Sequence, residues 1–218
     1  MNPSIRQKLS LRAKYLNEAR DFFMAHDVLE VETAILGTSA VTDPHVECMT
    51  TDGLMFLRPS PEYQLKQLLV AGSGDIFEIG KVIRDGEHGY KHNPEFTMVE
   101  WYRIGFKLQA IIDDTVSFIS RLASQSKYPV VKVEQLSYRE AFLKHAGFDP
   151  FSTDIEAIKS STLLLLAGKL SPNISSAMGD DKQAWLDLLM SHCIESRLHQ
   201  SAPDTLFVLT HFPAEQAL

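Results

Sequence analysis

Features that would mark a secreted, membrane-spanning or disulfide-stabilised protein are scarce in this sequence. It has two cysteines, Cys48 and Cys193, which lie far apart and in no metal-binding or redox spacing. We interpret them as reduced thiols of a cytoplasmic protein. The longest apolar run, residues 163–167, is too short to span a bilayer. The first residues lack the apolar core of a signal peptide, and no repeat or low-complexity segment is visible.

Basic residues are also fewer than acidic residues. The 218 residues include 21 lysines and arginines against 28 acidic residues, which gives a net charge of -7. This balance argues against a broad basic groove for nucleic acid and favours a partner with a basic surface. A hydrophobic content of 44% and a charged content of 22% are typical of a globular protein with a sizeable core.

Hydrophobic periodicity and helix punctuation predict the elements of the first half. Ser60 is a capping residue, Pro61 suits a first helical position and Gly72 can end a helix. Apolar residues recur at helical spacing in two stretches, and alternation marks the strands. The predicted elements are a helix over 4–26, strands over 28–33 and 54–60, a helix over 60–72 and a strand over 75–84.

A hairpin is predicted next along the chain. A polar loop of seven residues, 85–91, joins the strand 75–84 to the stretch HNPEFTMVEWYR at 92–103. Because the strands come as hairpins rather than as regular βαβ units, we predict an α+β fold with an antiparallel sheet flanked by helices. The remaining predicted elements are helices over 107–125, 137–147, 154–168 and 180–200 and a strand over 205–213.

The predicted hairpin places polar side chains where core residues would be expected. Strand side chains alternate between faces, so Phe96, Met98, Glu100 and Tyr102 share one face. A buried unpaired carboxylate is costly, so Glu100 requires a cation, and the amine of a ligand is one candidate. On the matching face of the first strand, Arg84 can grip two oxygens of a phosphate, and Phe96 can stack on a flat base.

Structural explanations are open for the same residues. Glu62 at a helix N-terminus can complement the helix dipole, which is worth ~0.3–1 kcal/mol. Arg84 and Glu100 can form an ion pair across the hairpin. His88 and His92 are four residues apart, a spacing that binds zinc on a helix, but they lie in a glycine-containing loop, so we expect no metal site within the chain.

Three stretches resemble the class II aminoacyl-tRNA synthetases in their lysyl form. VIRDGEHGYKHNPEFTMVEWYR at 82–103 resembles the second signature motif of that family. SPEYQLKQLLVAG at 60–72 is similar to its lysine-recognition helix, and HDVLEVETAIL at 26–36 is similar to its first motif, which forms the dimer interface. The resemblance covers essentially the whole chain and is closest to the short lysyl-tRNA synthetase-like ligases that act on elongation factor P.

The resemblance implies a role for each matching residue. Arg84 is implied to hold the ATP α-phosphate and to be the catalytic residue, while Phe96 stacks under adenine. Glu62 and Glu100 are implied to recognise the side chain and the amino group of lysine. The implied ATP-binding residues are Arg84, Asp85, Gly86, Glu87, His92, Asn93 and Phe96. The implied lysine-binding residues are Ser60, Pro61, Glu62, Glu100 and Tyr102.

The implied activity is that of an ATP-dependent ligase acting in two steps. The carboxylate of lysine or (R)-β-lysine attacks the α-phosphate, giving an aminoacyl-adenylate and pyrophosphate, and an acceptor then takes the aminoacyl group. The implied partners are ATP, Mg²⁺ with ligands expected beyond residue 218, and a second copy in a homodimer. We expect residues 1–218 to be the N-terminal and central part of one catalytic domain.

The implied acceptor is a lysine of elongation factor P. The catalytic-type sequence begins within the first few residues, so no anticodon-binding domain is expected and tRNA is not the expected acceptor. The residues leave open whether the donor is lysine or (R)-β-lysine.

The sequence departs from the family pattern at three places. Residues 84–87 read Arg-Asp-Gly-Glu where the second motif has Arg-x-Glu, which displaces the glutamate by one position. Ala34 follows Thr33 where the first motif has proline. The third motif, whose arginine binds the γ-phosphate in the family, is not found up to Leu218.

These departures keep two further hypotheses open. The chain can be a catalytic-domain fragment of a lysyl-tRNA synthetase, or a non-catalytic paralogue that binds an amino acid or an adenylate. They also predict little or no activity for residues 1–218 alone. Lysine-dependent ATP–pyrophosphate exchange by that polypeptide would contradict this expectation.

Overall fold

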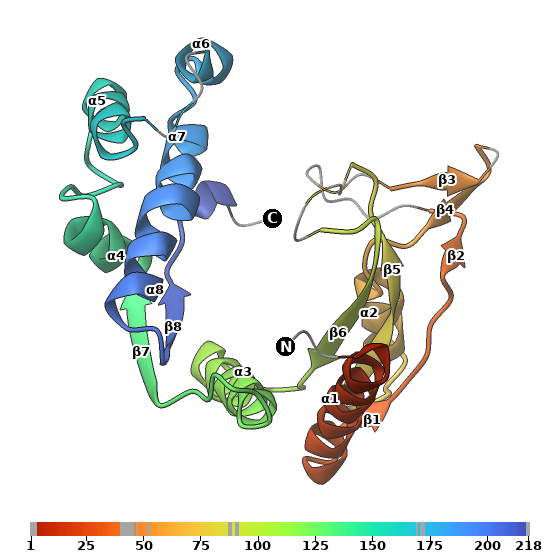
Figure 1. Ribbon diagram of the computed structural model, residues 1–218. Helices are drawn as coiled ribbons and strands as arrows, with labels where there is room; N and C mark the ends of the chain where they lie inside the picture. Colours follow the sequence, from red (N-terminus) through yellow and green to blue (C-terminus); the bar gives the residue numbers. More distant parts are fainter. Residues whose placement is uncertain are drawn as a thin grey trace. The chain divides into compact units, whose positions relative to one another are not determined.

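The chain folds into two compact units, with the boundary between Ser126 and Lys127. Figure 1 shows both units. The computed structural model describes residues 4–39, 46, 48–51, 53–86, 89, 92–168, 170 and 173–216. All the candidate site residues belong to the first unit. Within the described ranges, no helix is long and apolar enough to cross a membrane.

The first unit packs helices on a mixed sheet. One sheet has the strand order β1–β5–β6, in which β1 runs parallel to β5 and β6 runs antiparallel to it. A smaller antiparallel sheet has the order β2–β4–β3. The elements in chain order are α1 (Ile5–Ala25), β1 (Leu29–Glu30), β2 (Leu36–Gly37), β3 (Thr50–Thr51), β4 (Met55–Leu57), α2 (Glu62–Val70), β5 (Ile76–Ile83), β6 (Glu95–Tyr102) and α3 (Leu108–Ala123).

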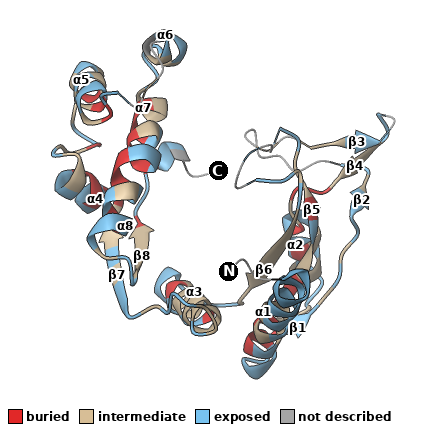
Figure 2. Ribbon diagram, viewed as in Figure 1, coloured by how far each residue is buried: buried red, intermediate tan, exposed pale blue. Residues whose placement is uncertain are grey.

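Helix α1 begins with a capping box and is buried only in its second half. Ser4 Oγ accepts the Gln7 N–H, and the Gln7 side chain accepts the Ser4 N–H in return. Residues 4–14 are exposed throughout, as the pale blue first turns of α1 in Figure 2 illustrate. Phe22 and Phe23, further along the helix, are buried.

An aromatic cluster holds α1 and α3 against the β5–β6 hairpin. The Phe23 ring stacks on Phe77 of β5 with ring centroids 4.5 Å apart. Phe118 of α3 lies 5.0 Å from Phe23 and 5.5 Å from Trp101 of β6. These contacts bury one face of the hairpin, so the opposite face of the two strands is left to carry the polar side chains.

The β5–β6 hairpin is the longest antiparallel ladder in the described chain. Its register runs from Ile76 opposite Tyr102 to Ile83 opposite Glu95. The predicted second strand begins only at Glu95, after Pro94, which has no N–H to give to a ladder. The Pro94 carbonyl still accepts the Arg84 N–H at 2.9 Å and closes the ladder next to the loop.

Two strands are shorter than predicted. The strand expected over 28–33 is limited to Leu29–Glu30, because the chain leaves β5 once the Val31 N–H has donated to the Phe77 carbonyl. The strand expected over 54–60 is limited to Met55–Leu57, since it runs toward Pro59, which cannot donate a ladder hydrogen bond.

Helix α2 also begins later than predicted. Its first residue is Glu62, and Pro61 occupies the capping position without a side-chain hydrogen bond of its own. Ser60 nevertheless accepts the Glu62 N–H through Oγ at 3.1 Å. The helix ends as expected at a glycine, because Gly72 has a φ of +89°, a conformation that favours glycine.

The second unit packs helices around a two-stranded parallel sheet. Strand β7 pairs with β8 from Lys132 opposite Thr205 to Ser137 opposite Thr210. The elements are β7 (Lys132–Ser137), α4 (Tyr138–His145), α5 (Ile155–Leu165), α6 (Ile174–Met178), α7 (Lys182–Leu189), a π-helix (Met190–Ile194), α8 (Glu195–Ser201), β8 (Thr205–Thr210) and a 3₁₀ turn (Ala214–Gln216). Trp185, Phe142, Ile158 and Leu189 are among its fully buried side chains.

The α+β class with an antiparallel sheet flanked by helices is confirmed. The parallel β7–β8 pair departs from the hairpin pattern that we expected, because strand β7 was not recognised in the sequence. The single helix predicted over 180–200 is interrupted by a π-helix at Met190–Ile194. The strand predicted over 205–213 ends at Thr210, where His211 adopts a φ of +57°.

Replacing Phe77 tests whether the aromatic cluster fixes the hairpin. We expect Phe77→Ala to lower the free energy of unfolding by ~3–5 kcal/mol, because it empties a fully buried position against Phe23. Leu54→Ala is the control, since Leu54 is 79% exposed and its change should stay within ~0.5 kcal/mol. Denaturant unfolding measures both, and equal effects of the two substitutions would contradict the description of this core.

Candidate functional site

The polar face of the β5–β6 hairpin forms the centre of the candidate site. The register pairs Phe96 with Val82 and Glu100 with Glu78. Directly opposed residues of an antiparallel ladder project from the same face. The face with Phe96, Glu100 and Tyr102 therefore coincides with the face of β5 that leads toward Arg84.

Arg84 lies directly beyond β5 and contacts Phe96. Its guanidinium carbon lies 5.3 Å from the centroid of the Phe96 ring. Its Nε donates to the Pro59 carbonyl at 3.2 Å. These two contacts place a permanent positive charge beside an aromatic plate, which is the combination that a nucleotide phosphate and its base require.

The carboxylate of Glu100 is held by two hydroxyl groups. Ser60 Oγ donates to Glu100 Oε2 at 2.8 Å, and the Tyr102 hydroxyl donates to Glu100 Oε1 at 2.9 Å. Among the described residues, none of the ion pairs includes Glu100. The structure thus brings together three of the residues implied to bind lysine, with a half-buried negative charge at their centre.

The alternative of an ion pair between Arg84 and Glu100 is wrong. The register places Glu100 opposite Glu78, while Arg84 lies beyond the last pair of the ladder, Ile83 and Glu95. The two charges are therefore separated along the hairpin, as two subsites would be.

Glu62 lies at the start of α2 and is half exposed. Its Oε1 forms an ion pair with Lys66 one helical turn further on. The charge of Glu62 also contributes to the electrostatic environment of Tyr102. The Glu62 carboxylate therefore forms an ordinary ion pair within the helix, and it is also near enough to Tyr102 to affect the pKa of that hydroxyl.

The proton of the Tyr102 hydroxyl is held unusually tightly. Burial, the negative charge of Glu100 and the hydrogen bond to Glu100 raise the pKa of Tyr102 above its ordinary value of 10.0. Glu62 adds a smaller contribution in the same direction. Tyr102 is therefore a fixed hydrogen-bond donor to Glu100 at neutral pH.

The other described residues implied to bind ATP are exposed and lie between the two strands. Asp85 and Gly86 follow Arg84, and Asp85 Oδ1 accepts the Gly86 N–H at 2.9 Å. His92 and Asn93 precede Pro94. Glu87 lies outside the described residues, as does His88, so the displaced glutamate of the motif remains a prediction.

Sequence reasoning missed a buried network beside this face. Arg58 and Glu78 form an ion pair at 2.6 Å with side chains only 5% and 2% exposed. Thr33 Oγ1 donates to Glu78 Oε2 at 2.7 Å, and Arg58 Nη1 donates to the Thr33 carbonyl at 3.1 Å. The available signal was two opposite charges, one directly after the apolar strand β4 and one within β5, since buried charges have to be paired.

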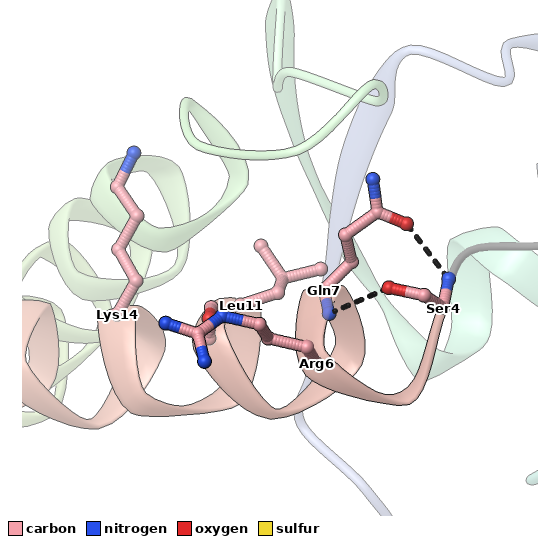
Figure 3. A pocket seen from close by; sticks show the side chains of 6 residues that line it. Ser4, Arg6, Gln7, Leu11 and Lys14 are labelled. Atoms are coloured by element: carbon pink, nitrogen blue, oxygen red, sulfur yellow. Dashed lines mark hydrogen bonds between the residues drawn. The ribbon is translucent and has the colours of Figure 1, made fainter.

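A surface cavity of about 470 Å³ lies elsewhere in the first unit, along the first turns of α1. Figure 3 shows the capping box of Ser4 and Gln7 at this cavity, with Arg6 and Lys14 extending from the same helix. Its lining residues are Ser4, Arg6, Gln7, Ser10, Leu11 and Lys14. No candidate site residue lines this cavity. Ser60 instead borders a small cavity of about 20 Å³ between β4 and α2.

A comparison with protein families matches nearly the whole chain. The family model described as tRNA synthetases class II (D, K and N) matches residues 1–217. The match therefore includes both compact units of the chain.

Similar curated proteins are identical to this chain at about a third of the aligned positions. A protein of Histophilus somni (strain 2336) named "Elongation factor P--(R)-beta-lysine ligase" is 36% identical over 220 residues, which cover 97% of this chain and 64% of that protein. A protein of the same name from Vibrio cholerae is 35% identical over 219 residues, covering 96% of this chain and 64% of its own length. The chain thus spans less than two thirds of the length of these relatives.

The ionisation of Tyr102 tests the geometry at Glu100. We expect wild type and Tyr102→Phe to develop the same tyrosinate absorbance as the pH rises through 10.0, because Tyr102 keeps its proton. The folded state binds this proton more tightly than the unfolded chain does. The associated stability is therefore complete below the unfolded value and is lost as the pH rises through the folded value.

Glu100→Gln is the matched variant, because it keeps the shape of the side chain and removes its charge. Burial still raises the pKa of Tyr102 in this variant, but the contribution of the Glu100 charge is lost, so Tyr102 should ionise at a lower pH in Glu100→Gln than in wild type. A one-tyrosine difference between wild type and Tyr102→Phe near pH 10.0 would contradict the arrangement.

Proposed function

The chain belongs to the class II tRNA synthetases of the D, K and N type, and from this premise we propose that it activates lysine or (R)-β-lysine with ATP and transfers it to a lysine of elongation factor P. The named relatives support (R)-β-lysine as substrate and elongation factor P as acceptor, because their name contains both. The site chemistry supports the activation step.

The observation that carries the proposal is the position of Glu100 relative to Arg84. The carboxylate of Glu100 is held by Ser60 and Tyr102 and has no cationic partner among the described residues, so an ammonium group of a substrate can complete it. The Arg84 guanidinium lies next to Phe96 on the loop side of the same hairpin. An amino acid joined to a nucleotide likewise carries an ammonium group and a phosphate at different positions.

In the first step, the substrate carboxylate attacks the α-phosphorus of ATP, and the bond to pyrophosphate breaks. Arg84 would neutralise negative charge that develops on the α-phosphate, and Phe96 would stack on adenine. Glu100 and Glu62 would bind the ammonium groups of the substrate. Because no protein bond forms or breaks, the contribution of these side chains is positioning and charge stabilisation.

In the second step, the amine of an acceptor lysine attacks the carbonyl carbon of the adenylate. An amide forms, AMP leaves, and the acceptor nitrogen gives up a proton. We propose the ε-amine of a lysine on elongation factor P as the acceptor, because the names of the relatives contain that factor.

Mg²⁺ accompanies ATP in the chemistry that we propose. Among the described residues, no cluster of three or more histidine, cysteine or acidic side chains could hold a metal ion. We therefore assign no residue of this chain to Mg²⁺ and derive no step through it.

We also propose a homodimer formed through α1 and β1. Ile5 and Leu9 on α1 are 73% and 60% exposed, and Leu29 on β1 is 59% exposed. Burying such apolar side chains against a second copy would stabilise an assembly by the hydrophobic effect. Sedimentation as a monomer at all concentrations would contradict this assembly.

We also propose that the protein acts in the cytoplasm, because a ligase that modifies a translation factor would act there.

A lysyl-tRNA synthetase activity is the second candidate, because the matching family model is described by tRNA synthetases. The two candidates share the activation step and differ in the acceptor. Transfer of labelled lysine by the protein that contains this chain to tRNA alone, and none to elongation factor P, would select the second candidate. Binding of an adenylate without transfer to either would indicate a non-catalytic paralogue.

Removing the Arg84 side chain tests the activation site. We expect Arg84→Ala to weaken the binding of a non-hydrolysable lysyl-adenylate analogue by about tenfold or more, since ~1.4 kcal/mol of charge stabilisation corresponds to that factor. Isothermal titration calorimetry measures the dissociation constants. Arg84→Lys should recover only part of the affinity, because an ammonium cannot grip two phosphate oxygens.

Arg121→Ala provides the matched control. Arg121 forms an ion pair with Glu18 at 3.1 Å between α3 and α1, on the packed side of the hairpin, so its loss should leave the dissociation constant unchanged. Equal affinities of wild type and Arg84→Ala, or an equal loss in Arg121→Ala, would refute the proposed site.

A further inference from the structure

Thr33 lies between two buried charges, and within the described part of the chain its hydrogen bonds go to Arg58 and Glu78 rather than to residues implied to bind substrate. Its hydroxyl donates to Glu78 Oε2 at 2.7 Å and accepts from Arg58 Nη1 at 2.5 Å. Its carbonyl accepts from Arg58 Nη1 at 3.1 Å. The hydroxyl therefore links both members of the ion pair, and its own segment, after β1, becomes part of the same network.

The Arg58 backbone begins a short segment that contacts both halves of the candidate site. The Arg58 carbonyl accepts the Ile83 N–H at 2.9 Å, directly before Arg84. The next carbonyl, that of Pro59, accepts from Arg84 Nε at 3.2 Å. Ser60 then donates to Glu100 at 2.8 Å. We name Arg58–Ser60 the linking segment.

The Arg58 side chain fixes the linking segment from one end. Its Nε donates to the Lys81 carbonyl at 3.1 Å, and its Nη2 lies 2.6 Å from Glu78 Oε1. A Cβ atom at Gly80 would collide with Arg58 Nη2 and lie only 2.7 Å from Glu78 Oε1, so glycine leaves the room that this ion pair occupies. A guanidinium with this many partners has one position, and the backbone that carries it is fixed with it.

We infer that the network of Thr33, Arg58 and Glu78 positions both halves of the site, and that Thr33 is a positioning residue for it. This inference rests on the proposed function for what the two halves bind. Loss of the Thr33 hydroxyl loosens Arg58, and the linking segment then holds Arg84 and Glu100 less firmly. Binding of the nucleotide part and of the amino-acid part should weaken together, although Thr33 touches neither.

Thr33→Val and Thr33→Ser separate the hydroxyl from the shape of the side chain. Valine keeps the branched shape and removes the hydrogen bonds, whereas serine keeps the hydroxyl. Arg58→Lys is a second variant in case valine impairs folding, because it keeps the charge but loses the planar fork. Phe118→Leu is the control for general destabilisation, since Phe118 is buried in the aromatic cluster on the other face of the hairpin.

Amide hydrogen exchange by NMR reports on the linking segment without any substrate. The Ile83 and Glu62 amides donate to the Arg58 carbonyl and to Ser60 Oγ. We expect both to exchange about tenfold faster in Thr33→Val and in Arg58→Lys, and at nearly the wild-type rate in Thr33→Ser. Phe118→Leu should not raise the exchange rates of these two amides more than those of other amides in the first unit.

Calorimetry with ATP, with lysine and with a lysyl-adenylate analogue gives the second readout. Thr33→Val should weaken all three by similar factors, and Thr33→Ser should restore them. Unchanged protection of Ile83 and Glu62 in Thr33→Val and Arg58→Lys would overturn the inference, as would an equal loss of binding in Phe118→Leu. If the two amides exchange faster in Thr33→Val and Arg58→Lys but the wild-type protein binds none of the three ligands, the positioning network is supported and the proposed function is refuted.

Discussion

The Arg58–Glu78 ion pair is the contact on which the polar face of the first unit depends, because two charges that are almost fully buried have to satisfy each other. Removing one member of such a pair leaves an uncompensated charge, which typically destabilises a protein by ~3–5 kcal/mol. Thr33 and the Lys81 carbonyl provide further partners for the guanidinium. The pair thereby fixes β5, the end of β4 and the segment after β1 in one arrangement.

From this fixed point, the backbone reaches both ends of a site that is suited to an aminoacyl-adenylate. The linking segment holds Arg84 through the Pro59 carbonyl and Glu100 through the Ser60 hydroxyl. The hairpin supplies the second constraint, since its register sets how far the two groups are separated. On the opposite face, the cluster of Phe23, Phe77 and Phe118 keeps the hairpin in place. The groups that we propose to bind the substrate are therefore positioned before it arrives, which would lower the entropic cost of the proposed reaction.

Local patterns were sufficient to predict much of this arrangement. Alternation in 75–84 and 92–103 predicted the hairpin and the shared face of Phe96 and Glu100, because side-chain period and turn length are local properties. The helix predicted over 137–147 starts where expected, because Ser137 forms a capping box with Glu140. What the sequence could not predict depends on contacts between distant residues.

The clearest example of such a contact is the ion pair of Arg58 with Glu78, 20 positions further on in sequence number, completed by Thr33 from a third segment. The parallel pairing of β7 with β8 is another, because more than sixty residues separate the two strands and no local pattern marks their register. The direct hydrogen bond from Ser60 to Glu100 was not predicted for the same reason, because Ser60 comes from a different element.

We propose that one face of the β5–β6 hairpin binds an amino acid joined to a nucleotide. A diffraction structure of the protein with a bound lysyl-adenylate analogue is the decisive test of this proposal. We expect adenine against the Phe96 ring, the phosphate at the Arg84 guanidinium and an ammonium group within hydrogen-bonding distance of the Glu100 carboxylate. An analogue bound at another surface, or bound here with its ammonium away from Glu100, would contradict it.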